Sequence, residues 1–152
     1  MNRYYYKDPY APKAETLHFG TAIAIWYHDQ ILLDHRRDGQ WGLIGGALEL
    51  GESLQDCAKR EILEETGLIA TNLQLIGTFS DPSRIIARQD KVMQCVTICF
   101  SVQIDTNKVR ISDESKELKF CSKEDLDHLQ IVPTHQMIIP YLFTRNAWPI
   151  MM

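Results

Sequence analysis

The chain alternates between segments whose apolar residues follow a strand-like pattern and segments that follow a helical one. Apolar-rich runs predict strands at residues 18–27, 31–36, 73–79 and 92–104, and shorter extended pieces at 41–44 and 118–121. Helical periodicity predicts a helix between Ser53 and Gly67, a short helix at 123–129, and another at 134–143 that Pro140 kinks or ends. This order favours an α/β fold, an α/β/α sandwich in which helices cover both faces of a mixed sheet.

The remaining segments are predicted to lack regular structure. Residues 1–16 contain turns at Pro9 and Pro12 and are expected to be irregular, and residues 107–116 are expected to form a polar loop. The tail at 144–152 ends in apolar residues that we expect to dock, either on this domain or on a second subunit. No repeat or linker interrupts the pattern, so residues 1–152 are predicted to form one domain.

The helix predicted after Ser53 has clear signals at both ends. Ser53 is a favourable N-cap with Asp56 three residues later, and Gly67 suits the left-handed position that follows a helix. Between them, one apolar stripe is predicted at helical spacing, and it consists of Leu54, Cys57, Ala58 and Ile62.

Three glutamates, Glu61, Glu64 and Glu65, are predicted to share that apolar stripe. Burying unpaired charge is unfavourable, like charges at this spacing repel by about 0.2–0.5 kcal/mol per pair, and the C-terminal half of a helix disfavours anions. Sequences break such rules mostly at functional sites, and a hard cation such as Mg²⁺ or Mn²⁺ would remove all three penalties. The alternative is a solvated acidic face on which Arg60 pairs with Glu64.

A glycine-rich loop is predicted immediately before this helix. Gly45 and Gly46 allow close backbone approach, so one of their carbonyl groups can face a cation while Gly46 leaves room for a phosphate. Glu52 adds a fourth carboxylate at the helix entrance, and Arg60 can neutralise or orient it if the loop folds back along the helix.

These residues match a known signature. Gly46, then Glu52, then the run Arg60–Leu68 resembles a complete Nudix box, in which every fixed position is filled. The upstream run from Ile31 to Leu43 also resembles the strand and loop that precede the box, so the resemblance covers about residues 17–143. One departure is Ile44, where many members of the family have proline before the double glycine.

The resemblance to the Nudix family implies the same sandwich fold and a Mg²⁺-dependent hydrolase, with Mn²⁺ as a substitute. The substrate would be a nucleoside diphosphate linked to another moiety, such as a nucleoside triphosphate or ADP-ribose. Glu61, Glu64, Glu65 and the Gly45 carbonyl group are the expected metal ligands, and Arg60 and Glu52 are expected to support catalysis. The expected general base is Glu114, then Glu117, or else a glutamate of the box.

Candidate substrate contacts lie outside the box. Arg36 and Arg37 precede the glycine loop, and Arg84 and Arg88 lie in a predicted loop, so each can reach a phosphate. The aromatic residues Trp26, Trp41 and Tyr4–Tyr6 can stack on a base, although packing in a core or interface is the commoner use of such residues.

Composition and charge narrow the function classes. The chain has 152 residues, 45% of them hydrophobic, and a net charge of −4, which suits a compact enzyme and argues against a nucleic-acid polymer as partner. The sequence has neither a signal-peptide pattern nor a run of membrane-spanning length, so we expect a cytoplasmic protein without a membrane partner. Cys57, Cys95, Cys99 and Cys121 show no zinc-type spacing and are expected to be reduced thiols.

Two other functions remain open from the sequence. One is a catalytically silent nucleotide-binding or regulatory module. The intact acids argue against it, because such a module would have no need to tolerate the repulsion among them. The other is an enzyme of the same fold but another class, such as an isomerase acting on an isoprenoid diphosphate. A homodimer also remains open, because the apolar tail can dock on a second subunit.

Overall fold

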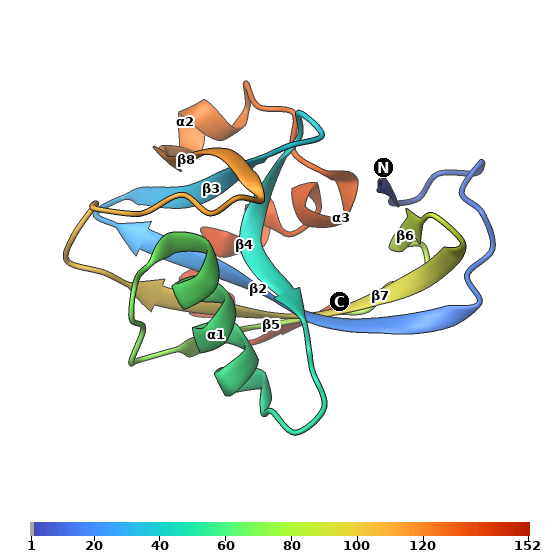
Figure 1. The fold of residues 1–152 in the computed structure, drawn as a ribbon, viewed down its shortest axis with the longest axis horizontal. Coiled ribbons are helices and arrows are strands. Elements are labelled where there is room, and N and C mark those ends of the chain that lie inside the picture. Colours follow the sequence, from blue (N-terminus) through green and yellow to red (C-terminus); the bar gives the residue numbers. More distant parts are fainter. Residues whose placement is uncertain (1) are drawn as a thin grey trace.

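A computed structural model describes residues 2–152, which form one mixed sheet with helices on both of its faces (Figure 1). The strands are β1 (Arg3–Tyr5), β2 (Thr16–Tyr27), β3 (Gln30–Arg36), β4 (Trp41–Ala47), β5 (Gln74–Phe79), β6 (Ile85–Arg88), β7 (Lys91–Gln103), β8 (Ser115–Cys121) and β9 (Ile150–Met151). The helices are α1 (Leu54–Thr66), α2 (Lys123–Leu126), α3 (Pro133–Gln136), α4 (Ile139–Leu142) and the 3₁₀ helix η1 (Arg145–Ala147).

The long strands β2 and β7 form the centre of the sheet. They run parallel to each other, and the strand order across the sheet is β1-β6-β7-β2-β4-β3-β8. The free edge of β7 pairs with β6 along its first part and with β5 along its second part. Strand β4 pairs with β3 along its first half and with β2 along its glycine-rich second half, which lies beside α1 (Figure 1).

Alternation along β2 and β3 divides the core into two layers. Ile23, Ile25 and Leu32 pack with Ala58 and Ile62 of α1 on one face of the sheet. The intervening residues of the same strands point to the other face, where they pack beneath the short C-terminal helices. This second layer contains Ala22, Ala24, Trp26, Ile31 and Leu33. The α/β sandwich with helices on both faces is therefore confirmed.

Several predicted element boundaries are wrong. The N-terminal segment predicted to be irregular contains β1, and the predicted loop around Arg84 and Arg88 contains β6, which pairs with β1. The double glycine does not lie in a loop, because β4 continues through Ala47. The helix predicted at 134–143 is divided into α3 and α4.

The C-terminal tail docks on its own sheet. Strand β9 pairs in parallel with β5, and the Met152 N–H donates to the Thr78 carbonyl oxygen at 2.9 Å. Trp148 packs against the core layer under α4, and its indole N–H donates to the Tyr141 carbonyl oxygen at 2.7 Å. Much of the apolar surface of the tail is thus used within one chain, although Met151 remains exposed.

Two further sequence expectations bear on the fold. No helix in the described part of the chain has the length and apolarity needed to cross a bilayer. All four cysteines are buried as free thiols, and burial raises the pKa of the Cys95, Cys99 and Cys121 thiols.

His135 connects α3 to β4 through a neutral ring. Its Nδ1 accepts a hydrogen bond from the Leu43 N–H at 3.0 Å. Burial, together with the positive charges of Arg36 and Arg84, lowers the pKa of His135 to about 3. His135 would bind a proton near pH 6.5 in the unfolded chain but only near pH 3 in the folded chain. The free energy of unfolding therefore decreases as the pH falls through that range.

We expect His135→Asn to remove this acid sensitivity, because an amide oxygen can accept the Leu43 hydrogen bond but does not titrate. Urea unfolding at pH 7.5 and pH 5 should show a smaller loss of stability in the variant than in the original chain. The exposed His128→Asn serves as the matched control and should lose as much stability as the original chain. An equal pH dependence in all three proteins would contradict the assignment.

Candidate functional site

A large cavity runs along the sheet from α1 toward β1 and β6, with a volume of about 680 Å³. One end is acidic and is lined by Asp34 of β3 together with Glu61, Glu64 and Glu65 of α1. The other end is lined by residues of β1, β2, β6 and β7. The glycine-rich end of β4 lies between the two ends.

The three glutamates of helix α1 differ in their exposure to solvent. The helix begins where the Ser53 side chain accepts a hydrogen bond from the Asp56 N–H, and it ends at Gly67 in the left-handed conformation, as predicted. Glu65 is 9% exposed and Glu61 is partly buried, but the Glu64 side chain is 58% exposed. The prediction that all three share the buried stripe is therefore wrong for Glu64, which lies at the rim of the cavity.

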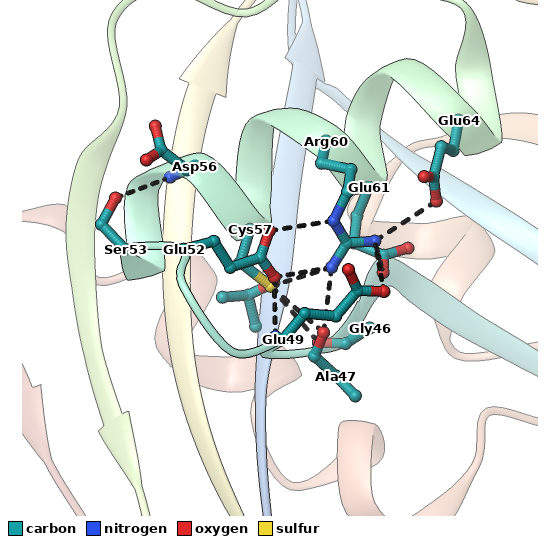
Figure 2. Close-up of polar contacts among 11 residues, drawn as sticks. Gly46, Ala47, Glu49, Glu52, Ser53, Asp56, Cys57, Arg60, Glu61 and Glu64 are labelled. Atoms are coloured by element: carbon teal, nitrogen blue, oxygen red, sulfur yellow. Dashed lines mark hydrogen bonds and ion pairs between the residues drawn. The ribbon is translucent and has the colours of Figure 1, made fainter.

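Arg60 connects the helix to the loop that precedes it (Figure 2). Its guanidinium forms a fork with Glu52, donating from Nε to Oε2 at 3.0 Å and from Nη2 to Oε1 at 2.8 Å. The same guanidinium donates to Glu61 at 2.8 Å, to Glu64 at 3.3 Å and to the Ala47 carbonyl oxygen at 3.0 Å. The loop folds back along α1 as predicted, and the hydrogen bonds of Arg60 hold the loop in this position.

Glu52 also accepts a hydrogen bond from within the loop that precedes α1. Its Oε1 accepts a hydrogen bond from the Glu49 N–H at 2.8 Å. The hydrogen bonds from Arg60, followed by that from Glu49, lower the pKa of Glu52 to about 2, so this carboxylate is ionised at neutral pH. Glu52 therefore acts as the anchor of Arg60, whose charge then orients the neighbouring Glu61.

Glu65 is a buried carboxylate that Arg60 does not reach. Its Oε2 accepts a hydrogen bond from the Gly45 N–H at 3.2 Å. Burial, together with the negative charges of Glu61 and Asp34, raises the pKa of Glu65 to about 9. Burial also raises the pKa of Glu61, against the opposing effect of Arg60. At neutral pH and without a cation, Glu65 therefore holds a proton, and a bound cation would favour its ionised form.

Gly46 lies directly against Glu61. A Cβ atom placed on Gly46 would be 2.2 Å from Glu61 Oε1, so a side chain at this position would displace the carboxylate. The close approach explains why the backbone here needs glycine, although it does so from a strand and not from the predicted loop.

The chemistry of these donors fits a divalent cation. Carboxylate oxygens are the ligands that Mg²⁺ prefers, and two of the carboxyl groups facing the cavity, Glu65 and Asp34, have pKa values raised mainly by burial. The three glutamates do not yet converge. Among residues 2–152, no group of three His, Cys, Asp or Glu side chains is close enough to hold an ion, and Arg60 binds both Glu61 and Glu64.

Asp34 was not predicted from the sequence. It lies on β3 on the same face as Leu32, which is the face that α1 covers, and its Oδ1 is buried without a hydrogen-bond partner. The signal was present in the pattern, because the alternation of β3 places an acidic residue at a position that a covering helix should bury. Asp34 extends the acidic end from the helix to the sheet.

The loop before β8 reaches the acidic end through Glu114. Glu114 lines the cavity, and its charge contributes to the raised pKa values of Glu61 and Glu65. Arg37 holds this loop by donating from Nε to the Asp113 carbonyl oxygen. Glu117, the second candidate base, instead faces His35, with 3.5 Å between Oε1 and Nδ1.

The predicted substrate arginines have different environments. Arg36 donates to the Tyr4 hydroxyl group and stacks on its ring at 4.8 Å, and both residues line the cavity. Arg84, predicted to lie in a loop, directly precedes β6, and its side chain is fully buried where it lines the cavity. Trp26 and Trp41 are buried in the core layer opposite α1, so neither is free to stack on a base.

Comparison with known proteins identifies relatives over most of the chain. The model of the NUDIX domain matches residues 16–142. An ADP-ribose pyrophosphatase of Methanocaldococcus jannaschii is 32% identical over 124 residues, which cover 78% of this chain and 69% of that protein.

Solved structures share the fold. The NUDIX domain of Shewanella oneidensis NrtR, complexed with ADP ribose, has a TM-score of 0.69 at 22% identity, covering 92% of this chain and 94% of that one. A bifunctional NMN adenylyltransferase/ADP ribose pyrophosphatase of Francisella tularensis, complexed with AMP and a Mn ion, has a TM-score of 0.68 at 20% identity. That match covers 91% of this chain but only 43% of the other.

Proposed function

Because the chain belongs to the NUDIX family of hydrolases, we propose that it hydrolyses the diphosphate linkage of a nucleoside diphosphate joined to another moiety, with Mg²⁺ as cofactor. The observation that carries this proposal is Glu65, a buried carboxylate beside Glu61 and Asp34 that Arg60 does not neutralise. Such a buried carboxyl group stays protonated at neutral pH, and a bound cation would supply the positive charge that stabilises its ionised form.

Glu61, Glu64 and Glu65 would hold the cation, with a backbone oxygen of Gly45 or Gly46 completing the site from β4. A divalent cation bound there would neutralise the substrate diphosphate and lower the pKa of a water molecule. The guanidinium of Arg60 supports this role because it fixes Glu61 from the outer side and leaves Glu65 free. Glu64 would have to turn inward from its exposed position at the rim.

Glu114 is the proposed general base, since it faces the same end of the cavity from a loop outside the helix. Its exposed carboxylate would accept a proton from the attacking water, and the hydrogen bond from Arg37 to the Asp113 carbonyl would keep the loop in place. Arg36, which donates to Tyr4 and lines the cavity from the same strand as Asp34, would contact a phosphate of the substrate.

ADP-ribose is the first substrate to test, because the M. jannaschii relative is an ADP-ribose pyrophosphatase and the S. oneidensis domain holds ADP ribose. Incubation with Mg²⁺ should yield AMP and ribose 5-phosphate, separated by ion-exchange chromatography. Nucleoside triphosphates, dinucleoside polyphosphates and sugar nucleotides complete the panel. Chelation by EDTA should stop turnover, and the Mg²⁺ dependence should return when the metal is restored.

The alternative, a silent nucleotide-binding module, is favoured by one observation, which is that Arg60 already pairs with Glu52, Glu61 and Glu64. Such a module would bind ADP-ribose without hydrolysing any member of the panel. Binding measured by calorimetry, with no product after prolonged incubation in Mg²⁺ or Mn²⁺, would replace the hydrolase proposal with this one.

A further inference from the structure

Three basic side chains line the end of the cavity away from α1. His18 comes from β2, while Arg84 directly precedes β6 and Arg88 ends it. Pairing of the strands brings them together, because His18 is in register with Cys95 of β7. The Cys95 N–H in turn donates to the Arg84 carbonyl oxygen at 2.8 Å. Segments far apart in the sequence thus deliver positive charge to one place.

Arg84 is a buried cation held only by neutral groups. Its Nη1 donates to the carbonyl oxygens of Phe79 at 2.6 Å and Cys95 at 3.3 Å. Its Nη2 donates at 2.9 Å to both the Thr97 hydroxyl and the Thr134 carbonyl oxygen. These acceptors fix the guanidinium in position but do not neutralise it, so the charge acts on the cavity.

Three nitrogen atoms in this group lack a partner. His18 Nε2, Arg84 Nε and Arg88 Nε are all buried, and each is without a hydrogen bond. Within residues 2–152, neither Arg84 nor Arg88 forms a salt bridge. Burial lowers the pKa of His18, and the charges of Arg88 and Arg84 lower it further, so the three groups act on one another. A bound anion would satisfy all three at once.

The basic group lies close to the acidic end. A Cβ atom placed on Gly20 would be 2.9 Å from the Gly46 carbonyl oxygen and 3.0 Å from His18 Cε1. Only the small residue Gly20 therefore separates His18 from Gly46, which in turn contacts Glu61. One substrate molecule can extend from the glutamates to the basic group within the same cavity.

We propose that His18, Arg84 and Arg88 form a subsite for a phosphate monoester of the substrate, distinct from the diphosphate that is hydrolysed. The inference rests on the proposed function and names its substrate class, a diphosphate-linked nucleotide that carries an additional phosphate group. A phosphate monoester has three acceptor oxygens and a charge of about −1.5 to −2 at neutral pH. Its three oxygens match the three nitrogen atoms of His18, Arg84 and Arg88 better than the two oxygens of a carboxylate do.

Substrate pairs that differ by one phosphate monoester test the proposal. ADP-ribose and its 2′-phosphate, NADH and NADPH, and dephospho-CoA and CoA place that group at different distances from the diphosphate. The original chain should hydrolyse the phosphorylated member of at least one pair with the higher kcat/KM. Arg88→Gln should lower this preference about tenfold or more, since a charged hydrogen bond contributes about 1.5–3 kcal/mol.

Arg3→Gln is the matched control, because it removes the same charge from β1 at an exposed position. Alternation along β1 directs Arg3 away from the face that carries Tyr4, so the preference should remain. An absence of preference in every pair, or an unchanged preference in Arg88→Gln, would overturn the subsite.

A second measurement separates this proposal from the proposed function. Inorganic phosphate in EDTA should raise the Tm of the original chain and of Arg3→Gln, but not that of Arg88→Gln or His18→Gln. If this pattern holds while no substrate is hydrolysed, the hydrolase assignment fails and the subsite remains. If phosphate raises the Tm of all four proteins equally, the subsite is wrong whatever the hydrolysis results. His18→Gln decides the outcome if Arg88→Gln does not fold.

Discussion

Replacing Glu65 by glutamine is expected to reduce kcat/KM by about 10²–10³-fold, the range typical for loss of one group that stabilises charge in a transition state. Glutamine keeps the size of the side chain and can still accept the Gly45 hydrogen bond, but it cannot supply the anionic oxygen that a divalent cation requires. Hydrolysis of ADP-ribose measured across a range of Mg²⁺ concentrations is the direct test.

The same variant should fold at least as well as the original chain when metal is absent. Because the pKa of Glu65 is raised to about 9, the folded protein binds a proton that the unfolded chain releases near pH 4.5. The contribution of Glu65 to stability is thus complete below pH 4.5 and is lost as the pH rises toward 9. Glu65→Gln should remove this loss in EDTA, whereas the exposed Glu15→Gln should retain it. Full activity in Glu65→Gln would refute the metal role.

Adding one methyl group at Gly46 is expected to lower activity by about 10²-fold without unfolding the protein. The new Cβ would lie 2.2 Å from Glu61 Oε1, which is the end of a flexible side chain and can move away. Displacing a reacting or coordinating group by about 1 Å can cost this much in rate. Gly46→Ala should therefore show a nearly unchanged Tm together with a strongly reduced kcat.

Gly45→Ala is the matched comparison. It adds the same methyl group one residue earlier, where we expect it to destabilise the fold. There the Cβ would be 2.0 Å from the Thr21 carbonyl oxygen, at a φ of 155° that side chains rarely adopt. Overpacking against backbone costs about 1–3 kcal/mol, with conformational strain in addition. A large loss of stability in Gly46→Ala, or none in Gly45→Ala, would contradict this account of β4.

The errors in the sequence predictions have a common cause. Strand β6 is only four residues long and ends in an arginine, so it lacks the length and alternation that identify a strand. Strand β1 pairs with it across about eighty residues of sequence, a contact that no local pattern reports. Arginines are usually exposed, and the burial of Arg84 depends on acceptors that include the Thr134 carbonyl oxygen, fifty residues away in the sequence.

The exposure of Glu64 differs from what helical periodicity predicts. A stripe calculated from 100° per residue includes Glu61, Glu64 and Glu65 together, yet Glu64 lies at the rim and is exposed. Its side chain points outward because Arg60, one turn earlier, binds it from the solvent side. Periodicity identified the correct helix face to within one position, and packing decided which acids are buried.

The sequence by itself determined the helix with its caps, the acids on one side of it, the glycines before it and the family to which the chain belongs. Each of these depends on residues that are neighbours along the chain, so local spacing is enough to specify them. Only the tertiary structure decided that Asp34 joins the acids and that His18, Arg84 and Arg88 meet at the far end of the same cavity. These groups lie on strands whose pairing depends on nonlocal contacts, and burial and charge in the folded chain then set their chemistry.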